Sequence, residues 1–323
     1  MLELALLILG AVSIFFIAEF FGLEQILAGL AGADPLIAAA AVVAQVLLLS
    51  LTALRLMVIS RKYARLGFLE AMNASLIGMF VSAVSPLARL GGEPAKVYLL
   101  KDKISAEKGS AVIAVDVLAE VISLYIVIMA SVVFLQNDIP SQLSPAILPF
   151  LIISVFLTVV FVKICTNREW LDGIIGFVSR IPKFSVLKER DYAQRFHESF
   201  GELARDGRSM LSVLLISLVM KLLEFARMWL VILALGQLVP FKVVVAVWLV
   251  LLVLSAVPWL PGGLGLVEGG MILALVQLGV APHVAGSAIL LDRFISFWLV
   301  IAAGFAAVWL NPAITYRFLR KLK

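Results

Sequence analysis

Six apolar runs, each long enough to form a helix across a bilayer, constrain this chain more than any other feature of its sequence. About 20 apolar residues are needed to cross a hydrocarbon core roughly 30 Å thick. Hydrophobic residues make up 63% of the chain and charged residues only 15%, far from the composition of soluble domains. We therefore predict an all-α, polytopic integral membrane protein with one membrane domain over residues 1–323. The runs are Leu2–Phe21, Leu36–Ile59, Gly109–Leu135, Ala146–Ile164, Leu211–Gly236 and Gly286–Leu310.

Lysine and arginine are concentrated in alternate connections between these runs. The intervening connections contain only one basic residue, Lys242. The positive-inside rule places the basic connections in the cytoplasm, so we expect a cell-membrane protein with both termini cytoplasmic. Within the basic connection at about 165–208 we predict an amphipathic segment that lies against anionic lipid. The basic connections hold Arg61, Lys62 and Arg65; Lys96, Lys101, Lys103 and Lys108; the range 168–208; and Arg317, Arg320, Lys321 and Lys323.

Two further apolar pieces, Phe68–Ser85 and Phe241–Val257, run into segments rich in glycine and proline. The charges place the end of Leu36–Ile59 and the start of Gly109–Leu135 in the cytoplasm. They place the end of Leu211–Gly236 and the start of Gly286–Leu310 outside. Each broken piece must therefore enter and leave the membrane on one side, the first from the cytoplasm and the second from outside. The sequence thus predicts two re-entrant hairpins in addition to about six transmembrane helices.

The two broken pieces resemble each other in sequence. SAVSPLARLGGE (Ser82–Glu93) aligns with SAVPWLPGGLGLVE (Ser255–Glu268), and further along Glu120 aligns with Asp292. We infer an internal repeat, with the first copy at about 68–135 and the second at about 241–310. Because the copies enter from opposite faces, the repeat has inverted topology, as in many secondary transporters.

Proline and glycine interrupt both hairpins where a plain span would be uniformly apolar. Non-helical backbone is tolerated at membrane depth only where protein or a water-filled cavity surrounds it. Breaks at corresponding positions of two repeats therefore predict a translocation site. The alternative is a pair of kinks that only pack helices together. The predicted breaks are Pro86, Gly91 and Gly92 in the first hairpin, and Pro261, Gly262, Gly263 and Gly265 in the second.

Ionisable side chains within the apolar segments are the candidate substrate-binding and translocation residues, because a charge is costly to hold in a bilayer. Asp116 and Glu120 are four residues apart and should share a helix face. Steps of three residues along the fifth run predict a cation–anion–cation ladder. Alternatively, these charges are neutralising pairs that only orient helices. The candidates are Arg89, Glu93, Lys96, Glu120, Lys221, Glu224, Arg227, Glu268, Asp292 and Arg293.

Three motifs, LARLGGEPAKVYLLK (Leu87–Lys101), LPGGLGLVEGG (Leu260–Gly270) and ILLDRFISFW (Ile289–Trp298), resemble the transmembrane flippase domain of lysylphosphatidylglycerol synthases. The resemblance covers nearly the whole chain and implies translocation of lipid between leaflets. The chain departs from the pattern in its first repeat, where Glu120 is followed by valine rather than by arginine. We expect no aminoacyl-transferase domain after Lys323, and therefore no synthase activity of the kind found in the fused relatives.

These observations together predict a flippase or scramblase for a polar or anionic lipid head group. Arg89, Lys96 and Arg293 would compensate the lipid phosphate, and Glu93 and Glu268 would pair with these cations when the site is empty. The chain lacks HExxH, GxSxG and Walker motifs, so we expect no catalytic residue, metal or cofactor. Expected partners are membrane lipids, and a second copy or a lipid-modifying enzyme are further candidates, whereas nucleic acid is not. The alternatives are a lipid head-group transferase and a non-transporting scaffold.

Overall fold

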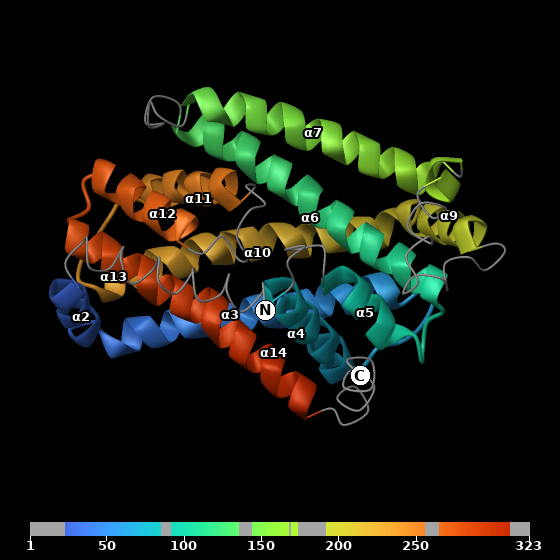
Figure 1. The fold of residues 1–323 in the computed structure, drawn as a ribbon, viewed down its shortest axis with the longest axis horizontal. Coiled ribbons are helices and arrows are strands. Elements are labelled where there is room, and N and C mark those ends of the chain that lie inside the picture. The colour runs from blue at the N-terminus through green and yellow to red at the C-terminus, as the bar shows by residue number, and fades with distance from the viewer. Residues whose placement is uncertain are drawn as a thin grey trace.

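The computed structural model describes residues 23–84, 92–135, 144–167, 169–173, 192–255 and 265–310, and the elements described are helices (Figure 1). This confirms the predicted all-α class. The helices are α2 (Leu23–Ala31), α3 (Pro35–Ser60), α4 (Phe68–Val84), α5 (Gly92–Leu100), α6 (Ala106–Leu135), α7 (Ser144–Thr166), α9 (Tyr192–Ala204), α10 (Gly207–Ala234), α11 (Phe241–Ser255), α12 (Leu266–Gln277), α13 (Pro282–Arg293), the π-helical turn η4 (Phe294–Trp298) and α14 (Leu299–Trp309).

Five of the six predicted spans coincide with helices, and Leu2–Phe21 lies outside the described residues. Among the described residues, four helical stretches are long and apolar enough to cross a membrane: α3, α6, α10 and the stretch Pro282–Trp309. The last begins four residues before the predicted start because Pro282 occupies the first helical turn, where its missing N–H costs nothing. Helices α4, α11 and α12 are shorter and apolar.

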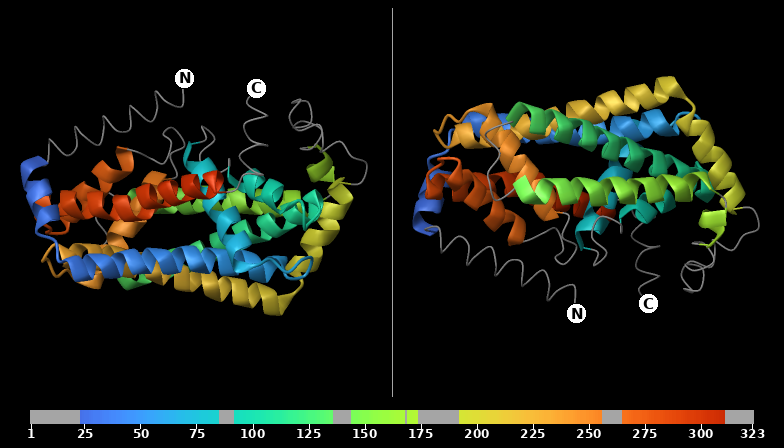
Figure 2. Two further views of the ribbon diagram at one scale, coloured as in Figure 1. Left: turned by 90° about the horizontal axis from the view of Figure 1, so that it is seen from below. Right: turned by 90° about the horizontal axis from the view of Figure 1, so that it is seen from above.

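Helices α3 and α10 lie side by side along the long axis of the molecule (Figures 1 and 2). Arg55 of α3 donates a hydrogen bond to Ser217 of α10, and Arg227 of α10 donates one to Gln45 of α3. The later residue of each helix thus contacts the earlier residue of the other, so the two helices run antiparallel. In both helices the arginine follows the contacted residue by ten positions.

Two groups of four helices share one pattern of contacts. In the group α3–α6 each helix contacts the next, and α3 also contacts α6. In the group α10–α13 each helix contacts the next, and α10 also contacts α13. The two groups also contact each other, because α6 contacts α11, and α14, which continues α13 beyond η4, contacts α4.

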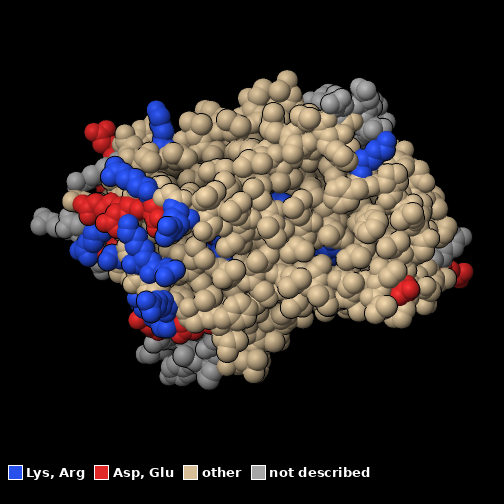
Figure 3. Space-filling view, turned by 180° about the vertical axis from the view of Figure 1, so that it is seen from behind, with Lys and Arg blue, Asp and Glu red and all other residues tan. Residues whose placement is uncertain are grey.

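Charge is distributed unevenly over the surface. Figure 3 shows most of the visible charged residues at one end of the molecule, next to a broad face that is almost free of charge. Helix α7 exposes Ile152, Phe156 and Val159, as expected of a helix that faces lipid. The exposed ion pairs Lys62–Glu202 and Arg195–Glu107 involve the basic connections of the sequence.

Helix α9 lies within the amphipathic segment predicted at about 165–208, and its apolar face packs against other helices of the protein. Phe196, Phe200 and Leu203 are buried, and α9 contacts α6, α7 and α10. The reason is the length of α6, whose 30 residues extend about 45 Å. A span needs only about 30 Å, so the first turns of α6 are free to cover α9.

Tyr192 at the start of α9 gives this contact a predicted pH dependence. Its hydroxyl lies 2.8 Å from Ser110 Oγ of α6. Burial raises the pKa of Tyr192 above its usual value of about 10, and nearby Glu107 acts in the same direction, whereas the Ser110 hydrogen bond opposes it. The fold therefore favours the neutral phenol. Its stabilising contribution is fully present below about pH 10 and is lost as the pH rises through the folded pKa.

We expect the Tyr192 hydroxyl to ionise at a higher pH than the hydroxyl of a free tyrosine. The measurement is the difference between tyrosinate absorbance titrations of the parent protein and the Tyr192→Phe variant. A difference curve with its midpoint at about pH 10 would show that the hydroxyl is exposed to water and that α9 is not docked as described.

Candidate functional site

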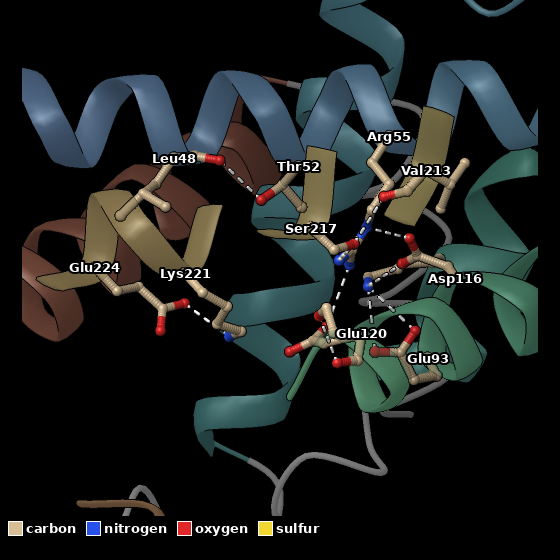
Figure 4. Close-up of polar contacts among 12 residues, drawn as sticks. Leu48, Thr52, Arg55, Glu93, Asp116, Glu120, Val213, Ser217, Lys221 and Glu224 are labelled. Carbon is tan, nitrogen blue, oxygen red and sulfur yellow. Dashed lines mark hydrogen bonds and ion pairs between the residues drawn. The ribbon is translucent and has the colours of Figure 1, made fainter. Parts of the chain in front are cut away.

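The first charge network joins α3, α5 and α6, and consists of Arg55, Glu93, Lys96, Asp116 and Glu120 (Figure 4). Arg55 Nε lies 2.6 Å from Asp116 Oδ1, and Arg55 Nη2 lies 3.1 Å from Glu120 Oε2. Lys96 Nζ lies 3.1 Å from Glu93 Oε2 and 3.9 Å from Asp116 Oδ2. The shared carboxylate of Asp116 thus connects the two cations into one network.

Helical spacing and a close helix contact assemble this network. Asp116 and Glu120 share one face of α6, as their four-residue spacing predicts, and both contact Arg55. Glu93 and Lys96 are three apart on α5 and pair with each other. Lys96 lies against Gly78 of α4, where a Cβ atom would be 2.8 Å from Lys96 Cε. A larger residue at position 78 would therefore force the Lys96 side chain into another conformation.

The cations of this network are buried, whereas two of its acids are partly exposed. The exposed fractions of the side chains are 3% for Arg55 and 5% for Asp116, against 30% for Glu93 and 43% for Glu120. Glu120 lies within the long apolar helix α6. A carboxylate within such a helix is expensive to expose to lipid, which favours contact with water or with a polar ligand.

The second charge network joins α10, α12 and α13, and consists of Arg227, Glu268, Asp292 and Arg293. Arg227 Nη2 lies 3.2 Å from Asp292 Oδ1, and Arg293 Nε lies 3.0 Å from Glu268 Oε1. The adjacent residues Asp292 and Arg293 therefore have different partners, because neighbours on a helix point about 100° apart. Both ion pairs are mostly buried, with Glu268 only 1% exposed.

Glu268 also organises the beginning of α12. The backbone N–H of Gly265 donates a 2.6 Å hydrogen bond to Glu268 Oε2. Gly265 has φ of 88°, a conformation that glycine adopts without the steric cost of a side chain. The predicted break at Gly265 thus has a local cause, and it ties the chain before α12 to the second network.

The predicted ladder on α10 is only half present. Lys221 Nζ lies 2.9 Å from Glu224 Oε1, and Glu224 Oε2 accepts a 3.1 Å hydrogen bond from the indole of Trp248 on α11. Arg227 is directed instead to Asp292 and Gln45. The ladder fails because a step of three residues turns a helix by about 300°, so Lys221 and Arg227 differ by about 120° around the axis.

The residues predicted from the sequence do not include Arg55, Gln45 or Ser217. An arginine within the apolar run Leu36–Ile59 was the available signal for the first, whereas the polar partners carry no distinctive pattern. The structure also divides the predicted set, because no contact in the described part of the chain joins Glu93 to Glu268. Outside the described residues lie Arg89, Pro86, Gly91, Pro261, Gly262 and Gly263. Of the predicted break residues, Gly92 and Gly265 are described.

Comparisons with known proteins agree with this membrane architecture. A UPF0104 membrane protein of Methanothermobacter thermautotrophicus is 27% identical, over 98% of this chain and 98% of its own length. Another from Methanocaldococcus jannaschii is 25% identical, over 94% of this chain and 93% of its own. The family model described as the lysylphosphatidylglycerol synthase TM region matches residues 2–304. Because this match covers nearly the whole chain, the protein belongs to the family of the lysylphosphatidylglycerol synthase TM region.

Proposed function

We propose that this membrane protein translocates a polar or anionic lipid head group between leaflets as a flippase or scramblase. The observation that carries the proposal is the pair of charge networks, each of which includes a glutamate in the first turn of a short helix that follows a glycine-rich stretch of the sequence. Charges at this depth are rare unless they line a path or hold a ligand. The family supports a role connected with lipids.

The helix contacts support an inverted repeat with two re-entrant hairpins, α4–α5 and α11–α12. The groups α3–α6 and α10–α13 share one contact pattern. Their arginines, Arg55 and Arg227, reach across to the other group at the same ten-residue spacing between antiparallel helices. Each arginine also pairs with an aspartate on the fourth helix of its own group. These pairings favour Asp116, rather than Glu120, as the counterpart of Asp292.

The proposed path runs through the partly exposed acids of the interior. Glu93, Glu120 and Glu224 keep 30%, 43% and 25% of their side chains exposed. We place water at this surface and the fatty tails in the surrounding lipid. Lys96 and Arg293, now engaged by Glu93 and Glu268, would exchange these carboxylates for the lipid phosphate. The charged end in Figure 3 would face the cytoplasm.

Purified protein in liposomes tests the proposal. The vesicles carry fluorescent lipids with anionic, zwitterionic or aminoacylated head groups, and a membrane-impermeant quencher reports the outer leaflet. We expect faster exchange than in protein-free vesicles for at least one head group, with no change in lipid mass. Glu93→Gln combined with Glu268→Gln should return the rate to that of protein-free vesicles.

Glu202→Gln is the matched control for this assay. The substitution is chemically the same, but Glu202 belongs to an exposed ion pair with Lys62 at 3.5 Å. Its translocation rate should equal that of the parent. Equal rates in the presence and absence of protein for every head group would contradict the proposed function, as would a loss of rate in Glu202→Gln as large as in the double variant.

A further inference from the structure

The two proposed hairpins are held in different ways. In the first hairpin, Glu93 pairs with Lys96 of its own helix, at 3.1 Å. That pair can travel with α5 and does not attach it to a neighbour. Between the side chains of α5 and α6, the one ion pair in the described part of the chain is Lys96–Asp116 at 3.9 Å.

In the second hairpin, the corresponding glutamate is bound to a different helix. Glu268 of α12 pairs with Arg293 of α13 at 3.0 Å, and the pair is 1% and 13% exposed. Its other oxygen accepts the Gly265 N–H. Movement of α12 away from α13 must therefore break a buried ion pair at 3.0 Å, whereas movement of α5 away from α6 breaks only the longer Lys96–Asp116 contact at 3.9 Å.

Two features indicate that the Glu268–Arg293 contact can be broken and formed again during function. Arg293 Nη2 is buried and makes no hydrogen bond within the described residues, so the guanidinium is incompletely satisfied where it is. The π-helical turn η4, Phe294–Trp298, follows immediately. Such turns interrupt the regular hydrogen bonding of a helix and are frequent at functional sites. Helix α6 is an uninterrupted α-helix at the comparable position.

We propose that the Glu268–Arg293 pair is a latch that holds the α11–α12 hairpin against α13, with η4 as the hinge beyond it. The proposal rests on the proposed function, because it identifies which hairpin must be unlocked for the site to open on the second side. In this structure the latch is closed, while the acids of the first network are partly exposed.

Thiol labelling tests the latch without any measurement of lipid. Cys165 is the one cysteine of the chain, so Cys165→Ser removes the native thiol. Ile272→Cys then places a reporter one helical turn after Glu268, at a position that is 1% exposed. In detergent, a water-soluble maleimide should label this thiol slowly while the latch is closed.

Glu268→Gln and Arg293→Gln in this background should each raise the labelling rate at least about tenfold, as expected for loss of a buried ion pair. Arg293→Lys retains the charge and should label more slowly than Arg293→Gln. Glu93→Gln is the matched control in the first hairpin and should leave the rate within about twofold. Gel filtration checks that each variant stays folded, and if Glu268→Gln does not, the two Arg293 variants decide the question.

Unchanged labelling in the glutamine variants would overturn the latch, and so would equal rates for Arg293→Lys and Arg293→Gln. The outcome is separable from that of the liposome assay. If Glu268→Gln labels fast but the parent protein moves no lipid in the liposome assay, the proposed function is overturned and the latch stands. Slow labelling in a protein that does move lipid would overturn the latch alone.

Discussion

Replacement of Arg55 by leucine should cost about 3–5 kcal/mol of folding stability, because the substitution leaves a buried carboxylate without its main partner. Asp116 is 5% exposed and lies 2.6 Å from Arg55 Nε. Its remaining cation, Lys96, is 3.9 Å away and is shared with Glu93. The measurement is the midpoint of thermal or denaturant unfolding in a fixed detergent.

The double variant separates the cost of an unpaired charge from the value of the pair. A buried ion pair replaced by apolar side chains of similar size is often no less stable than before. Arg55→Leu with Asp116→Leu should therefore recover most of the lost stability. Asp116→Leu alone should cost less than Arg55→Leu, because Arg55 keeps Glu120 and Ser217 as partners.

Lys62→Leu is the matched control for Arg55→Leu. It removes a cation from an exposed pair, where Glu202 is 3.5 Å away and both side chains reach water. Such pairs contribute about 0–1 kcal/mol, so this variant should unfold close to the parent. If Arg55→Leu unfolded as late as Lys62→Leu, the guanidinium could not be buried against Asp116.

The double variant at positions 55 and 116 also connects stability with the proposed function. A protein whose ion pair only orients helices should work once leucine packing has restored its fold. A protein that moves a charged head group along this network should fold and yet be slow in the liposome assay. The neutralising-pair alternative and the translocation proposal therefore predict opposite results for a single sample.

Local periodicity made much of this fold predictable from the sequence. The apolar runs gave the long helices, because twenty apolar residues leave few alternatives in a membrane protein. The pairs Glu93–Lys96 and Asp116–Glu120 followed from the number of residues in a helical turn. Gly265 was predicted from the composition of its segment, and the structure gives it a positive φ.

Contacts between distant helices were not predictable in the same way. Arg55 meets Glu120 across 65 residues and Ser217 across 162 residues. Periodicity states which face of a helix is polar, but it does not state which helix that face will meet. The ladder on α10 failed for the related reason that three-residue steps drift around the axis. The packing of α9 against α6, α7 and α10 is another contact between distant segments, which the charge pattern alone did not reveal.

Replacement of Gly92 by alanine should push α5 away from α4 and disrupt the first charge network next to it. A Cβ atom there would overlap the carbonyl oxygen of Gly78 and the hydroxyl of Ser82 on α4. Gly92 is not among the glycines with positive φ, so its requirement is space rather than backbone conformation. Since α5 begins at this residue, a shift away from α4 would carry Glu93 and Lys96 with it.

The expected cost of Gly92→Ala is about 1–3 kcal/mol or more, together with loss of translocation, because a backbone carbonyl cannot turn aside as a side chain can. Gly78→Ala meets only the flexible chain of Lys96 and should cost less stability while it displaces that lysine from Asp116. Gly109→Ala is the control, since its nearest contact is Val97 Cγ1 at 3.4 Å. Thermal unfolding and the liposome assay on the same three proteins check the order. A Gly92→Ala protein as stable as Gly109→Ala would mean that α4 and α5 do not touch at this glycine.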